Sequence, residues 1–144
     1  MRRTVQVMLV VAIVIDVAYW TTWALARDVL ASSHREAYYE FENAFPLADL
    51  WLAVACAGAL VAVTRGSVRA PLWLTAAGAA GLYLFGMDFL YDVEHGIFLS
   101  GGGGVVEAVI VALTLVFSLT MLVHGWREDG RARERDSQAS LADA

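Results

Sequence analysis

The sequence predicts an all-α membrane protein, a single bundle of four transmembrane helices with both termini in the cytoplasm. Of its 144 residues, 59% are apolar and 17% are charged, and the mean hydropathy is +0.59. This composition is too apolar for a water-soluble domain of this size. The apolar residues also gather into four runs, each close to the ~20 residues that a helix needs to cross ~30 Å of hydrocarbon.

The four apolar runs define the expected spans in chain order. They cover residues 5–26, 47–64, 72–90 and 105–123. None alternates polar and apolar residues as a β-barrel strand does, and backbone amides in lipid must bond within their own segment, so helices are expected. Pro46 and Pro71 suit the first turns of the second and third helices, where a missing amide is tolerated. The bundle therefore forms one domain over residues 1–125.

Two segments lie outside the spans. In the outer loop, residues 27–45, Glu36, Glu40 and Asn43 share one helical face and aromatic rings occupy another, which predicts a short amphipathic helix on the membrane. Residues 126–144 are highly charged, so we expect a disordered cytoplasmic tail that buries no apolar surface.

The arginines indicate the orientation of the chain. All 10 basic residues are Arg, and Arg is retained on the cytoplasmic side of a membrane. Arg27 and Arg35 lie on one side of the predicted spans. The others lie on the opposite side: Arg2, Arg3, Arg65, Arg69, Arg127, Arg131, Arg133 and Arg135. This asymmetry predicts a multi-pass protein of the cell (plasma) membrane with both termini inside.

Charge and cysteine content exclude several classes of function. A net charge of −5 argues against nucleic acid, which requires a basic surface. The only cysteine, Cys56, lies in an apolar run, so an intramolecular disulfide, a paired-cysteine redox site and a four-cysteine zinc site are all excluded. We expect no cofactor and no metal site.

Asp16 is the most informative residue because it is an isolated acid within the first apolar run. Such a residue costs about 2.5–3.5 kcal/mol on membrane-insertion scales and is by default a functional candidate. Its helical neighbours at i+3, i+4 and i+7 are Tyr19, Trp20 and Trp23. A carboxylate beside aromatic rings suits an organic cation, or an apolar substrate that meets an acid.

The other spans each carry one acid near the predicted outer end: Asp49, Asp88 and Glu107. If the third helix continues past the membrane, Asp88, Asp92 and His95 share one of its faces. The candidate catalytic residues are Asp16, Asp88 and Glu107. The candidate binding residues are Tyr19, Trp20, Trp23, Glu40, Asn43, Asp49, Trp51, Asp92 and His95.

These residues predict an outward-facing acidic and aromatic pocket for a hydrophobic or cationic small molecule. One hypothesis is an enzyme acting on a lipid or isoprenoid, with Asp16 as general acid and Asp88, Glu107 or Asp49 as the base. The alternatives are a proton-coupled transporter that uses Asp16, or an accessory membrane subunit without catalysis. The expected partners are the bilayer and the small molecule. Stripes of small residues in the middle spans permit close packing within one bundle or in a homodimer.

Overall fold

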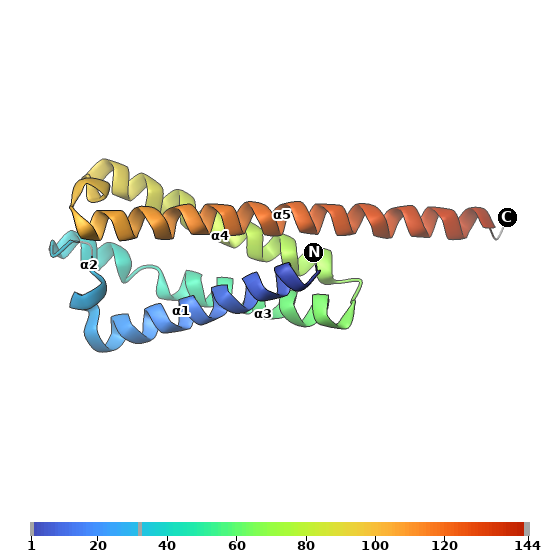
Figure 1. The fold of residues 1–144 in the computed structure, drawn as a ribbon, viewed down its shortest axis with the longest axis horizontal. Coiled ribbons are helices and arrows are strands. Elements are labelled where there is room, and N and C mark those ends of the chain that lie inside the picture. Colours follow the sequence, from blue (N-terminus) through green and yellow to red (C-terminus); the bar gives the residue numbers. More distant parts are fainter. Residues whose placement is uncertain (1, 32, 143–144) are drawn as a thin grey trace.

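A computed structural model of the chain describes residues 2–31 and 33–142 and shows a bundle of long helices (Figure 1). Every regular element in these ranges is helical. In order they are α1 (Arg2–Leu30), α2 (Glu36–Glu42), α3 (Pro46–Arg65), α4 (Ala70–His95), the 3-10 helix η1 (Ile97–Leu99) and α5 (Gly102–Ala142). The all-α, four-helix prediction is confirmed. The short helix α2 and η1 lie at one end, called here the α2 end, and the start of α1 and the α3–α4 turn lie at the other, the N-terminal end.

The four long helices have the length and composition to cross a membrane. The candidate spans are Arg2–Leu30, Glu36–Arg65, Ala70–His95 and Gly102–Glu134, so α2 is counted with α3. Large apolar side chains point away from the bundle: Val14 is 59% exposed, Ile15 55% and Leu113 58%. An apolar outer surface of this kind is what contact with lipid requires.

The helices pack in the order α1 on α3, α3 on α4, and α4 on α5. One core joins all four, and its fully buried residues include Leu9, Cys56, Leu74 and Met121.

Small residues lie at these contacts. The ring of Trp73 occupies the space beside Gly58, and a Cβ at Gly78 would lie 2.8 Å from the carbonyl oxygen of Ser118. The small residues therefore pack helices within one bundle, and a homodimer stays a prediction.

Backbone turns at glycine end two of the helices. Gly66 follows α3 with φ 64°, and Gly96 follows α4 with φ 66°, a region that favours glycine. At the N-terminal end, the Arg2 guanidinium donates to the carbonyl of Val63 and, at 2.6 Å, to that of Thr64. These bonds fasten the start of α1 to the end of α3.

Three helices run further than the predicted spans. α1 continues to Leu30 across a non-helical residue, Ala26, and α4 continues to His95. α5 continues through residues 126–142, where the sequence predicts a disordered tail. Two ion pairs on this part of α5 stabilise successive turns: Arg131 with Glu128 at 2.7 Å and Arg133 with Asp129 at 2.9 Å.

The packing of α4 on α5 makes Gly78→Ala a test of the fold. We expect a loss of about 1–3 kcal/mol in the free energy of unfolding, because the new methyl group meets rigid backbone. Thermal unfolding in detergent, followed by circular dichroism, measures it. Gly86→Ala on the same helix is the matched control, since a Cβ there would meet no atom within 4 Å. Equal effects of the two changes would contradict this packing.

Candidate functional site

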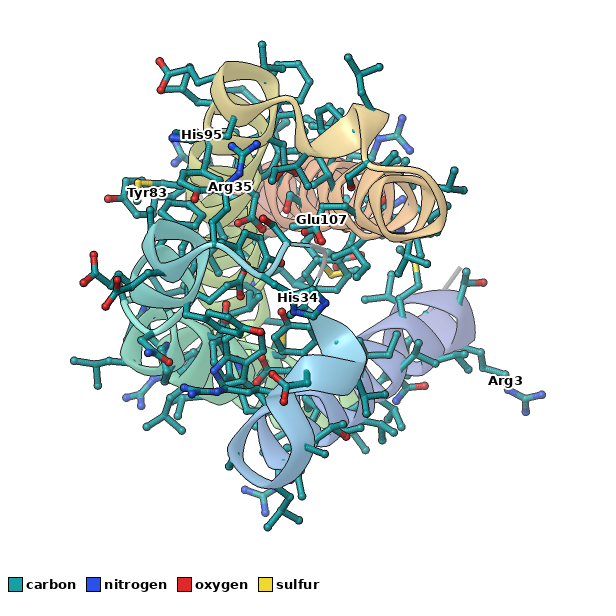
Figure 2. All side chains as sticks on the ribbon, turned by 90° about the vertical axis from the view of Figure 1, so that its left-hand side faces the viewer. Arg3, His34, Arg35, Tyr83, His95 and Glu107 are labelled. Atoms are coloured by element: carbon teal, nitrogen blue, oxygen red, sulfur yellow. The ribbon has the colours of Figure 1, made fainter. Side chains whose placement is uncertain are left out.

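Buried acids gather at the α2 end of the bundle. Glu42 on α2 is 6% exposed, Asp92 on α4 is 2% exposed and Glu107 on α5 is 7% exposed. Asp88, one turn before Asp92, is half-buried. Figure 2 looks onto this end and shows Glu107 near the centre of the bundle, whereas Tyr83 points away from it. Glu42, Asp88, Asp92 and Glu107 are called here the α2-end acids.

The α2-end acids lie within electrostatic range of one another. Asp88 interacts with all three others, and Glu107 interacts with both Glu42 and Asp92. Like charges repel more strongly where protein and lipid replace water. The ion pairs among the described side chains lie instead on the far part of α5. Within that described set, neither Asp88 nor Asp92 is paired with an Arg or a His.

Asp92 carries the least satisfied atom of the site. Its Oδ2 is buried and has no hydrogen-bond partner among the described residues. Buried polar atoms are nearly always hydrogen-bonded, and a buried carboxylate oxygen without a partner is costly. This oxygen is therefore one that a donor or a positive charge on a ligand could satisfy.

Aromatic rings from three helices cluster at the α2 end of the bundle. Tyr38 of α2 is 1% exposed, and its ring centroid lies 6.2 Å from that of Tyr91 on α4 and 6.5 Å from that of Trp23 on α1. Phe41 stacks on Tyr91 at 3.8 Å. Ring faces in general attract cations.

The aromatic residues of α1 bind polar groups on other elements. Tyr19 donates a hydrogen bond to Glu42 at 3.0 Å, and Trp20 donates to Asp49 at 2.8 Å. Trp23 donates to the side-chain oxygen of Asn43 at 3.1 Å. The three residues that share a face with Asp16 in the sequence thus fasten α1 to α2, to α3 and to the connection between them.

Asp16 lies apart from the α2-end acids. It is half-buried on α1, and the acid within electrostatic range of it is Asp49 of α3. It also lies close enough to Cys56 to interact with that thiol. The structure therefore brings Asp16 together with Asp49, and does not bring it together with Asp88 or Glu107.

Three other predicted site residues lie outside the group. Glu40 is exposed, and Trp51 is 54% exposed on the outer surface of α3. α4 does continue through His95 as the spacing requires, but His95 is exposed whereas Asp92 is buried. The His95 ring stacks on Tyr91 at 4.0 Å and its Nδ1 donates to the Tyr91 carbonyl at 2.9 Å.

Two residues at the centre of the site, Glu42 and Tyr38, are not among those that the sequence predicts. The spacing of Glu36, Glu40 and Asn43 predicts a helix lying on the membrane, whereas α2 buries Tyr38 and Glu42 against the bundle. The signal was the spacing of four residues between Tyr38 and Glu42, which puts a ring and a carboxyl on one helical face.

No three His, Cys, Asp or Glu side chains within the described part of the chain are arranged to hold a metal ion. Comparisons with protein families, with curated proteins and with solved structures find no match. The function must therefore be inferred from the site itself.

The hydrogen bond from Trp20 to Asp49 gives a second testable prediction. Trp20→Phe should lower the free energy of unfolding by about 1–3 kcal/mol, because the carboxylate loses its indole donor in a partly buried position. Trp51→Phe removes the same atoms from a side chain that is 54% exposed, and should have a much smaller effect. Thermal unfolding of both variants in detergent measures the difference. If Trp51→Phe lowered the free energy of unfolding as much as Trp20→Phe does, the hydrogen bond from Trp20 to Asp49 would not contribute to stability.

Proposed function

We propose that this chain is an integral membrane protein that binds a cationic, partly apolar small molecule among the α2-end acids. The observation that carries the proposal is Asp92, a carboxylate 2% exposed whose Oδ2 has no hydrogen-bond partner in the described part of the chain. Three further acids interact with it or with its neighbours. A bound positive charge would offset this repulsion and satisfy the orphaned oxygen.

The surrounding side chains favour an organic cation. Tyr38 is 1% exposed and lies four residues, about one helical turn, before Glu42 on α2, and Tyr19 donates a hydrogen bond to Glu42 at 3.0 Å. Ring faces bind ammonium and phosphonium groups. The acids of the described chain are not arranged as a metal-binding set, which also favours a diffuse charge over a small ion. In the topology that the arginines predict, the α2 end faces the outside of the cell.

Proton-coupled transport is a second candidate function, and one observation favours it. Asp49 lies within electrostatic range of both Asp16 and Asp88, so a row of acids leads from α1 to the α2-end acids. Acids in such rows can exchange protons for a cationic substrate. Proton movement coupled to cation release from proteoliposomes would distinguish transport from binding alone.

The proposed binding site is tested with tetraphenylphosphonium as the probe and isothermal titration calorimetry in detergent as the measurement. We expect Asp92→Asn to weaken binding at least about tenfold, because one buried charge contact, worth about 1.4 kcal/mol or more, is lost. We also expect the variant to unfold at the same or a higher temperature than the wild type, since it buries less charge.

Glu94→Gln is the matched control, because Glu94 lies on the same helix, carries the same charge and is exposed. It should bind the probe as the wild type does. Triphenylphosphine oxide, a neutral relative of the probe, should bind far more weakly to the wild type. Wild-type affinity in Asp92→Asn, or equal affinity for the neutral compound, would overturn the proposal.

A further inference from the structure

A pocket lies at the opposite end of the molecule from the α2-end acids. It has a volume of about 320 Å³ and is lined by α1, the α3–α4 turn and the far part of α5. α1 packs mainly on α3, and α5 on α4, so the pocket lies where α1 and α5 are not held against each other. Its position at the ends of the candidate spans corresponds to the headgroup depth of a bilayer.

The pocket has an apolar floor and a charged rim. Val5 is 3% exposed, Val63 9% and Leu74 1%, and these three side chains lie at its base. The rim carries the guanidinium groups of Arg2 and Arg131 and the carboxylate of Glu128. Two positive charges and one negative charge favour an anionic ligand that also has an apolar part.

The guanidinium groups of Arg2 and Arg131 each make hydrogen bonds through one nitrogen atom, which leaves other N–H donors for a ligand. Among the described residues, Arg2 bonds the α3 carbonyls through Nη2 alone, and Arg131 bonds Glu128 through Nη1 alone, at 2.7 Å. An arginine that is already ordered loses less conformational freedom when it binds a ligand. Its planar donors also match the oxygen atoms of a phosphate.

We propose that this pocket binds the phosphate of an anionic phospholipid. The acyl chains lie against the exposed apolar side chains of α1 and α5, which include Val7 and Val10 at 61% and 45% and Val116 and Leu119 at 58% and 47%. The arginines flanking this end, among them Arg3, Arg65 and Arg69, add to its attraction for an acidic bilayer surface. This site is independent of the proposed cation site.

The test titrates the full-length protein in detergent with dioleoyl-phosphatidylglycerol and counts bound lipids by native mass spectrometry. Arg131→Gln should weaken binding roughly five- to tenfold, because one charge-assisted contact to the phosphate is lost. Arg133→Gln is the matched control: Arg133 lies on the same helix and is paired with Asp129 at 2.9 Å, away from the pocket. It should keep its affinity within about twofold.

A second variant introduces repulsion without touching an arginine. Val68 lines the pocket and is 91% exposed, so Val68→Glu leaves the core intact and should weaken lipid binding as Arg131→Gln does. Three results would overturn the proposal: equal binding of dioleoyl-phosphatidylcholine, equal loss in Arg133→Gln, or wild-type affinity in Val68→Glu. Displacement of the lipid by an equimolar amount of inorganic phosphate would show that the ligand is the free ion and not a lipid.

Discussion

The close approach of α4 and α5 is the constraint on which the rest of the structure depends. The missing side chains of Gly78 and Gly81 let α4 approach the backbone and hydroxyl of Ser118, and Gly104 lets the start of α5 pack on the carbonyls that precede it. Close backbone contact of this kind is how helices associate in lipid, where apolar burial supplies little driving force. It fixes Asp88 and Asp92 on one helix relative to Glu107 on the next.

This arrangement gathers several carboxyl groups at one end of the scaffold. The main core is apolar and is packed around Leu9, Leu74 and Met121, and a second, mainly aromatic cluster at the α2 end includes Trp23 and Tyr38. Functional sites commonly contain groups whose burial is unfavourable, which breaks a rule that the rest of the protein follows. The packing of the other residues compensates for the stability that is lost there. Here the broken rule is the burial of several carboxyl groups together. Eight of the ten arginines lie beyond the other ends of the predicted spans, whereas Arg27 and Arg35 lie at the α2 end.

The sequence predicted the helices but not how they rotate. Span length and the first-turn prolines Pro46 and Pro71 are local properties, so the four long helices follow from the sequence. The partner of Asp16 is set by the rotation of α1 against α3, which no local pattern specifies. The burial of Glu42 likewise depends on how α2 packs against the long helices, which its sequence does not specify. The high charge of residues 126–142 predicts disorder, whereas the structure shows helix there, with two ion pairs between neighbouring turns.

The central claim is that Asp92 and Glu107 repel each other inside the bundle, and a double-mutant cycle tests it most directly. The measurement is the free energy of unfolding in mixed micelles for Asp92→Asn, Glu107→Gln, the double variant and the wild type. Removing either carboxylate relieves the same repulsion. The increase in the free energy of unfolding should therefore be smaller in the double variant than the sum of the increases in the two single variants, by on the order of 1 kcal/mol. Effects that add to within about 0.5 kcal/mol would contradict the claim.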